Sequence, residues 1–164
     1  MKHNTKLFLK TALFSVVAPG MVAVFLPLLI VRGRAAASGV TLGAALLLLA
    51  LGAAIFLRCA WDFVVAGKGT PAPIDQPKRL VIRGLYRYSR NPMYVGVLSV
   101  IAGWAVLFGA GILAAYAAAW FVIFSLFVRF YEEPQLTRKF GDEYAAYRER
   151  VGRWLPRRSR GNVR

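Results

Sequence analysis

The stretch NPMYVGVLSVIAGWAVLFGAGILAAYAAAWFVIFSLFV, residues 91–128, decides the fold. It contains no charged side chain. Because about 20 apolar residues suffice to cross a hydrocarbon core roughly 30 Å thick, the stretch is too long for one membrane helix and about right for two. Phe108-Gly109-Ala110-Gly111 lies near its middle, and two glycines favour a tight turn between helices. The sequence therefore predicts a helical hairpin with spans at about 93–108 and 112–130.

Two further uncharged stretches, Thr11–Val31 and Ser38–Leu57, occupy the first half of the chain. They predict spans at about 11–31 and at 40–57 continuing toward 66. The first exceeds the 7–15 apolar residues typical of a signal peptide, so we interpret it as a span. The chain has 164 residues, 58% hydrophobic and 18% charged, and a soluble domain of this size needs more polar surface. We expect an all-α integral membrane protein with about four transmembrane helices.

The formal net charge is +15, and its distribution predicts an orientation. With four spans, 20 of the 22 Lys and Arg residues fall on one side of the membrane and two on the other. By the positive-inside rule, both termini and the central loop face the cytoplasm. Because the charge flanks spans, we expect it to attract anionic lipid headgroups and expect no nucleic-acid partner. Cys59 and His3 are single, which excludes a disulfide framework, a Cys- or His-based metal site and a Ser/His hydrolase.

The segment GKGTPAPIDQPKR, residues 67–79, predicts a loop because three prolines and two glycines cannot continue a helix. It divides the chain into an N-terminal scaffold of two spans, residues 1–66, and a core, residues 67–164. The core contains the loop, the hairpin and a C-terminal helix, and the two parts together form one membrane domain. The oligomeric state stays open.

The C-terminal helix is predicted from PQLTRKFGDEYAAYRERV, residues 134–151. Apolar or aromatic residues fall at 136, 140, 144, 147 and 151, which places them on one helical face opposite charged residues. This pattern is typical of an amphipathic helix that lies at the membrane surface or folds over the protein.

A polar cluster, YRYSRNPMYVG at residues 86–96, precedes the third span. Pro92 suits the first turn of that helix and Asn91 suits its N-cap. The free N–H groups and the positive end of the helix dipole should then lie beside Asn91. The cluster is either an aromatic and basic belt at the membrane interface or one wall of a binding site.

A second cluster, Arg129, Glu132 and Glu133, ends the fourth span. Carboxylates near a membrane are costly unless they pair, face a polar cavity or reach the interface. Adjacent helical residues point about 100° apart, so at most one of the two glutamates can point directly into a pocket. Arg129 is either an interfacial anchor or a clamp for a carboxylate, which guanidinium groups bind bidentately.

The two clusters together closely resemble the isoprenylcysteine carboxyl methyltransferase family, which is related to phospholipid N-methyltransferases. The resemblance lies in GLYRYSRNPMYVG, followed about 35 residues later by RFYEEPQLTRKFGDEYAAYRERVGRWLP, and covers about residues 71–156. It implies an integral membrane enzyme, in a bacterium at the inner membrane, that uses S-adenosylmethionine and no metal. The cofactor pocket would lie at the cytoplasmic side, covered by the C-terminal amphipathic helix.

Residue by residue, the resemblance assigns cofactor contacts and one substrate contact. Arg129 is a candidate for binding a substrate carboxylate. The cofactor contacts would be Lys78, Arg79, Leu80, Val81, Tyr86, Asn91, Pro92, Met93, Tyr94 and Glu132. The family usually has histidine where this chain has Asn91. Asparagine cannot take up a proton near neutral pH, so we interpret position 91 as cofactor-binding.

The acceptor would be lipid-soluble, either a small molecule or a lipidated substrate. Prenylated cysteine, another lipid-soluble carboxylate, a phospholipid amine and a thiol all remain open as acceptors. A carboxylate or thiolate is already anionic and needs no base, whereas an amine must lose a proton. Two other classes are also open: an NADPH-dependent membrane reductase of the sterol type, and a non-catalytic membrane scaffold.

Overall fold

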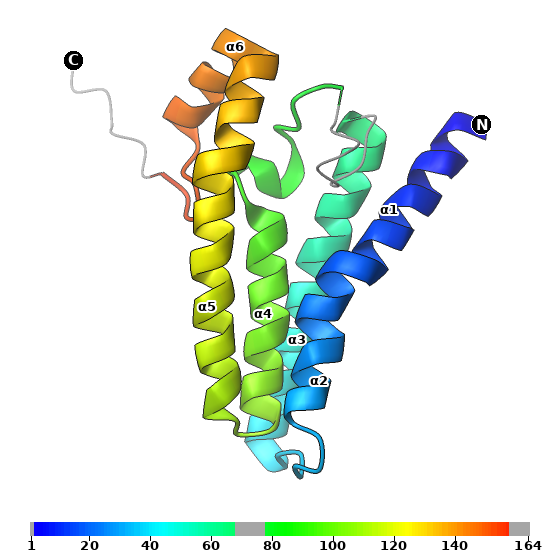
Figure 1. The fold of residues 1–164 in the computed structure, drawn as a ribbon, viewed down its shortest axis with the longest axis vertical. Coiled ribbons are helices and arrows are strands. Elements are labelled where there is room, and N and C mark those ends of the chain that lie inside the picture. The colour runs from blue at the N-terminus through cyan, green and yellow to red at the C-terminus, as the bar shows by residue number, and fades with distance from the viewer. Residues whose placement is uncertain (1, 68–77, 158–164) are drawn as a thin grey trace.

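The computed structural model describes residues 2–67 and 78–157, which are mostly helical and contain no β-strand (Figure 1). The all-α fold is thus confirmed, and residues 68–77 of the predicted loop lie outside the described residues. The six α-helices are α1 (Lys2–Gly20), α2 (Leu26–Ile30), α3 (Gly39–Asp62), α4 (Pro92–Leu107), α5 (Gly111–Phe127) and α6 (Glu133–Arg150). Three π turns, Met21–Phe25, Phe63–Gly67 and Val128–Glu132, and one 3-10 turn, Gly84–Arg87, complete the described elements.

Three segments of the described chain are long and apolar enough to cross a membrane, judged by length and composition: Thr11–Ile30, Gly39–Gly67 and Gly111–Arg150. They correspond to the predicted first, second and fourth spans. The predicted third span is α4, which has only 16 residues. At about 1.5 Å per residue it is roughly 24 Å long, shorter than the hydrocarbon core. Pro92 at its first turn and the positive φ of Gly109 after its last turn set these limits.

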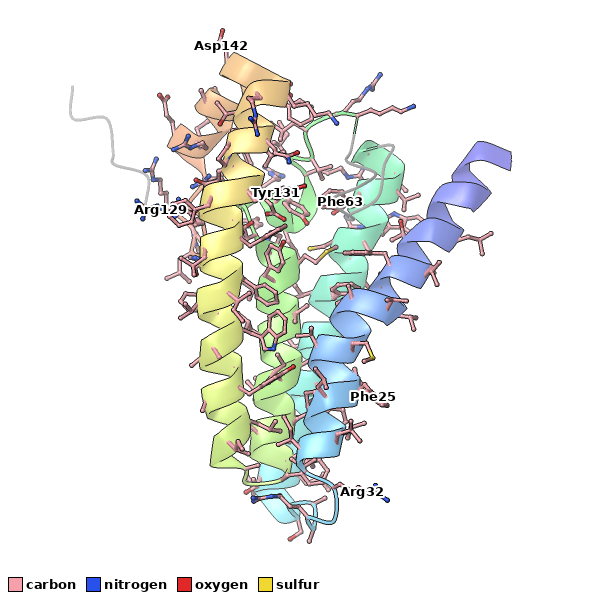
Figure 2. The ribbon with its side chains drawn as sticks, viewed as in Figure 1. Phe25, Arg32, Phe63, Arg129, Tyr131 and Asp142 are labelled. Atoms are coloured by element: carbon pink, nitrogen blue, oxygen red, sulfur yellow. The ribbon has the colours of Figure 1, made fainter. Side chains whose placement is uncertain are left out.

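The two ends of the molecule contain different segments of the chain. The N-terminus and α6 lie at one end, whereas the α4–α5 turn and the connection that carries Arg32 lie at the other (Figures 1 and 2). The predicted orientation requires this arrangement, because it places the N-terminus and the C-terminal helix on one side of the membrane and the first and third connections on the other. Which end faces the cytoplasm stays a prediction.

Helices α3 and α4 approach closely at small residues. A Cβ added to Gly52 would come within 2.7 Å of the Gly96 carbonyl oxygen, and one added to Gly96 would come within 2.9 Å of the Gly52 carbonyl oxygen. A Cβ on Gly103 would be 2.8 Å from the Leu49 side chain. Small residues permit such close backbone contact between membrane helices, where no water drives association. Helices α3 and α4 are therefore closely packed against each other.

The irregular helix that joins α1 to α2 is held by two side chains from the hairpin. Pro27 has no N–H to donate to the carbonyls four and five residues earlier, those of Ala23 and Val22, and both registers matter because the turn is a π turn. The indole Nε1 of Trp104 donates to that oxygen at 2.9 Å, and the Tyr116 hydroxyl donates to the Val22 oxygen at 2.9 Å. Carbonyls freed from helical hydrogen bonding are tolerated in a membrane when neighbouring helices satisfy them. These bonds tie the Met21–Phe25 turn to α4 and α5.

Helix α6 continues from α5 and then bends back at Gly141, whose φ of 48° and ψ of −122° are not helical. The predicted apolar face is confirmed on both sides of the bend, although the bend itself was not predicted. Tyr144, Tyr147 and Val151 are buried together, and Leu80, Leu136 and Phe140 pack against them. The C-terminal segment therefore folds over the protein.

Candidate functional site

A cavity of about 620 Å³ lies where α4, α5 and the start of α6 face α1. This volume is in the range of small-molecule sites. The end of the cavity toward α6 carries the polar groups, among them Arg90, Asn91, Glu132 and Gln135. The rest of the wall is apolar and comes from α1, the π turn after it, α3, α4 and α5: Phe14, Val17, Met21, Val22, Phe56, Val97, Trp120, Ile123 and Phe124. The cavity thus joins a polar end to an apolar arm.

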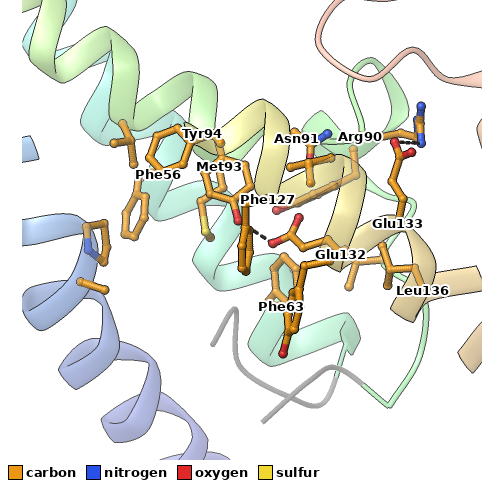
Figure 3. A pocket seen from close by; sticks show the side chains of 18 of the residues that line it. Phe56, Phe63, Arg90, Asn91, Met93, Tyr94, Phe127, Glu132, Glu133 and Leu136 are labelled. Atoms are coloured by element: carbon orange, nitrogen blue, oxygen red, sulfur yellow. Dashed lines mark hydrogen bonds and ion pairs between the residues drawn. The ribbon is translucent and has the colours of Figure 1, made fainter. Parts of the chain in front are cut away.

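Tyr94 and Glu132 face each other at the polar end (Figure 3). The Tyr94 hydroxyl donates a hydrogen bond to Glu132 Oε1 at 2.5 Å. No described residue forms an ion pair with Glu132. The uncharged stretch that contains α5 ends at Val128, the first residue of the π turn, so Glu132 lies just beyond it. Burial raises the pKa of this carboxyl and the Glu133 charge adds to the rise, although the Tyr94 hydrogen bond opposes it. The site therefore contains a carboxylate without a countercharge.

Glu133 points away from Tyr94 and toward arginines (Figure 3). Its carboxylate accepts hydrogen bonds from Arg90 Nη1 at 2.7 Å and from Arg153 Nε and Nη2 at 2.8 and 2.9 Å. Burial alone would raise the pKa of Glu133, but the Arg153 hydrogen bonds and the charges of Arg90, Arg153 and Arg148 outweigh burial and lower it. The two adjacent glutamates thus differ: arginines neutralise Glu133, whereas Glu132 forms no ion pair with a described residue.

The segment after α6 is attached to the polar cluster before α4. The Arg90 backbone N–H donates to the Gly152 oxygen at 2.9 Å, and Arg90 Nε donates to the Val151 oxygen at 3.1 Å. The Arg153 oxygen accepts from Ser89 Oγ and from Asn91 Nδ2, each at 3.1 Å. These bonds hold the C-terminal segment against the polar cluster that precedes α4, at the polar end of the cavity.

Asn91 occupies the N-cap position of α4 as predicted, but its side chain makes no capping hydrogen bond. Its amide is used instead for the bond to the Arg153 oxygen. Asn91 is buried and lines the cavity. The residue that stands in place of the family's histidine therefore fixes the C-terminal segment against α4.

Most of the predicted cofactor contacts meet at this cavity. The predicted residues that line it are Leu80, Val81, Tyr86, Asn91, Met93, Tyr94 and Glu132. Lys78 and Arg79 are exposed and do not line it, and Pro92 is buried beside it. The geometry brings seven of the ten residues together, and their role in binding a cofactor stays a prediction.

Arg129 does not line the cavity. Its side chain is exposed on the outer side of the continuous α5–α6 helix, whereas Tyr131 lies toward the interior (Figure 2). The guanidinium lies 5.7 Å from the centre of the Phe130 ring. The spacing of three residues to Glu132 suggested a shared face, but the π turn Val128–Glu132 alters the helical register between them. Arg129 is therefore not placed to bind a substrate carboxylate inside the cavity.

Several cavity residues were not singled out from the sequence. Phe56 and Phe63 on one side and Phe124 and Phe127 on the other line it. The Tyr94 ring packs on Phe124, with ring centres 4.5 Å apart. Aromatic residues are so frequent in this chain that nothing in the sequence separates these from lipid-facing ones. The partnership of Arg90 with Glu133 could have been inferred only from opposite charge in the two linked clusters.

Comparison with known proteins places the chain in a family. The family model described as phospholipid methyltransferase matches residues 40–143, well over half of the chain. The chain belongs to the phospholipid methyltransferase family. The family match covers nearly all of α3, which was predicted to belong to the scaffold, and extends past Glu132 to residue 143. The predicted division at residue 67 stays a prediction.

An uncharacterised protein of Haemophilus influenzae is 32% identical to this chain over 63 residues. The aligned region is 38% of this chain and all of that protein. No solved structure matches the chain. The family membership and the apolar helices support a membrane methyltransferase.

Proposed function

We propose that this protein transfers a methyl group from S-adenosylmethionine to a lipid-soluble acceptor at the cavity between α1, α4 and α5. The observation that carries the proposal is the Tyr94–Glu132 pair at the polar end of a 620 Å³ cavity in a member of this family. When bound, S-adenosylmethionine supplies an activated methyl group on a positively charged sulfur. Methyl transfer from that sulfur needs positioning and electrostatic support and no metal.

The residues at the polar end suit this cofactor. The Glu132 carboxylate has no countercharge among the described residues and can accept hydrogen bonds from an ammonium group or ribose hydroxyls. Tyr94 and Phe124 offer ring faces, which attract a cation such as a sulfonium. Tyr86 and Met93 complete the wall near Asn91. Lys78 and Arg79, though outside the cavity, would add positive charge at its mouth for the cofactor carboxylate.

The apolar arm supports a lipid-soluble acceptor. Its wall is formed largely by apolar side chains of α1, of the π turn after it and of α5, including Val17, Met21 and Ile123. These helices are two of the segments long enough to cross a membrane. A hydrocarbon chain in this arm would bury apolar surface and hold the reactive group near Glu132. An acceptor delivered from the bilayer also explains why the site is built into membrane helices.

The charges of the cavity favour an amine over a carboxylate as the acceptor. Arg90 is the cation that lines it among the described residues, and Glu133 already neutralises Arg90 at 2.7 Å. A carboxylate, as in prenylated cysteine, would face Glu132 without a cation to bind. An amine is attracted by Glu132, and the raised pKa of this carboxyl suits it to accept the proton that the amine must lose. A phospholipid amine is therefore the acceptor that we propose.

The membrane orientation is also part of the proposal. The end of the molecule that carries α6 and the polar end of the cavity is the end at which we expect 20 of 22 basic residues. By the positive-inside rule this end faces the cytoplasm, where S-adenosylmethionine is made. In a bacterium the protein would lie in the inner membrane.

Isothermal titration of detergent-solubilised protein with S-adenosylhomocysteine tests the cofactor. We expect binding by the wild type, at least tenfold weaker binding by Glu132→Gln, and unchanged binding by Glu143→Gln, which removes an exposed carboxylate from α6. NADPH binding in place of S-adenosylhomocysteine would indicate a reductase. Binding of neither by folded protein would indicate a scaffold.

Labelled S-adenosylmethionine tests the acceptor. The protein is incubated with vesicles of phosphatidylethanolamine and, in parallel, with farnesylcysteine in phosphatidylcholine vesicles. We expect label in the phosphatidylethanolamine headgroup. Label in farnesylcysteine alone would contradict the amine while leaving the methyltransferase activity established.

A further inference from the structure

Three arginines outside the cavity gather around one surface hollow. Arg129 comes from the π turn after α5, Arg138 from the part of α6 before the bend at Gly141, and Arg148 from the part after it. The hollow has a volume of about 440 Å³, and Pro134 and Thr137 line it as well. The bend at Gly141 turns the second part of α6 back toward the first, so residues up to 19 positions apart line the same hollow. The hollow therefore forms because α6 folds back on itself.

None of these three arginines forms an ion pair with a described residue, although the Arg148 charge does act on Glu133 at longer range. Arg129 lies over the Phe130 ring at 5.7 Å and Arg148 over the Tyr144 ring at 5.9 Å, contacts that orient a guanidinium without neutralising it. The carboxylate that lines the hollow is Glu133, and Arg90 and Arg153 already neutralise it. The hollow thus has a net positive charge.

The hollow lies where an apolar helix surface ends. Val122 and Leu126 are exposed on α5, 55% and 51%, and precede Arg129 by seven and three residues. Residues at such spacing share one face of an α-helix, and the π turn begins only at Val128, so this apolar surface leads up to the turn that carries Arg129. Phe130, 70% exposed, extends the apolar surface beside Arg129. Acyl chains can lie along this face of α5 while a headgroup reaches the hollow.

We propose that this hollow, lined by Arg129, Arg138 and Arg148, binds the phosphate headgroup of an anionic membrane phospholipid. Guanidinium groups bind phosphate oxygens bidentately, and basic residues close to a membrane surface attract anionic lipids. The bound lipid is separate from the acceptor in the cavity, because Arg129, Arg138 and Arg148 do not line the cavity. It would anchor the α5–α6 junction, and with it Glu132, at the membrane interface.

The binding of phosphatidylglycerol, added to detergent-solubilised protein and measured by native mass spectrometry, tests the proposal. The hollow variant is Arg129→Gln/Arg138→Gln/Arg148→Gln. The control variant, Arg87→Gln/Lys139→Gln/Arg150→Gln, removes the same charge from exposed positions outside the hollow. We expect at least about tenfold weaker binding by the hollow variant and wild-type binding by the control. We expect phosphatidylcholine to bind both variants and the wild type alike.

Three results would overturn the proposal. One is wild-type phosphatidylglycerol binding by the hollow variant, and another is equal loss in the control variant, which would show a dependence on net charge alone. The third is displacement of the lipid by millimolar inorganic phosphate, which would show a site for free phosphate. If the triple variant has a lower thermal unfolding midpoint, Arg138→Gln alone replaces it, because that exposed side chain forms no ion pair with a described residue. None of these measurements depends on methyltransferase activity.

Discussion

The hydroxyl of Tyr94 and the carboxylate of Glu132 are hydrogen-bonded at 2.5 Å although 38 residues separate them. The bond joins the first turn of α4 to the end of the π turn that follows α5, and so connects the two polar clusters of the sequence. It spans the polar end of the cavity and fixes the direction of the carboxylate. The cofactor proposal depends on this pair more than on any other contact.

Tyr94→Phe should weaken S-adenosylhomocysteine binding about tenfold, because a hydrogen bond to a charged group contributes about 1.5–3 kcal/mol and Glu132 loses its orientation without it. Isothermal titration measures the change. The matched control is Ser99→Ala, which removes another hydroxyl from α4 whose bond goes to the Val95 oxygen of the same helix. If Ser99→Ala has the same effect as Tyr94→Phe, general loosening of α4 and not Glu132 is responsible.

Glu133→Gln should lower the free energy of unfolding by roughly 2 kcal/mol. Removing one partner of a buried ion pair typically costs about 3–5 kcal/mol, and the effect is smaller here because Arg153 is 32% exposed and can be solvated. Thermal unfolding in detergent measures the loss. Glu149→Gln, at an exposed position of α6, is the control and should leave the unfolding midpoint unchanged.

The pH dependence of stability gives a separate test of Glu133. Its pKa is lowered in the folded protein, whereas the unfolded chain has the ordinary value of about 4.3. The ion pairs therefore contribute fully above that value, and their contribution is lost as the pH falls through the lowered folded pKa. Wild-type stability should fall more steeply below about pH 5 than that of Glu133→Gln. Parallel profiles would contradict the assignment.

How far the sequence could predict this structure depends on how local each feature is. The turn at Gly109 and the apolar face from Leu136 to Val151 follow from composition and period, and both are confirmed. The bend at Gly141 was not predicted because the apolar period continues through it. The paired position of Glu133 could not be predicted either, since its partners are 43 and 20 residues away in sequence. The role of Asn91 likewise depends on the distant Arg153 oxygen.

Gly96→Ala should destabilise the fold by roughly 1–3 kcal/mol, because the added Cβ would lie 2.9 Å from the Gly52 oxygen and overpacking of this kind typically costs that much. Gly43→Ala is the control on α3, where an added Cβ meets nothing within 4 Å. Since alanine favours helix by up to about 1 kcal/mol over glycine, the control should be neutral or stabilising. Thermal unfolding measures the stability of both variants. Equal destabilisation by Gly96→Ala and Gly43→Ala would argue against close α3–α4 contact.

The carbonyl freed by Pro27 gives a prediction that a double-mutant cycle can isolate. Trp104→Phe removes the indole that donates to the Ala23 oxygen and should cost roughly 1–3 kcal/mol through lost packing and an unpaired carbonyl. Pro27→Ala supplies an N–H that can donate to that oxygen. In the Pro27→Ala background, Trp104→Phe should therefore cost about 1 kcal/mol less, within the range of interhelical hydrogen bonds in membranes. Unfolding of the four proteins in detergent measures the coupling. A cost of Trp104→Phe that is the same in both backgrounds would mean that the indole contributes by packing alone.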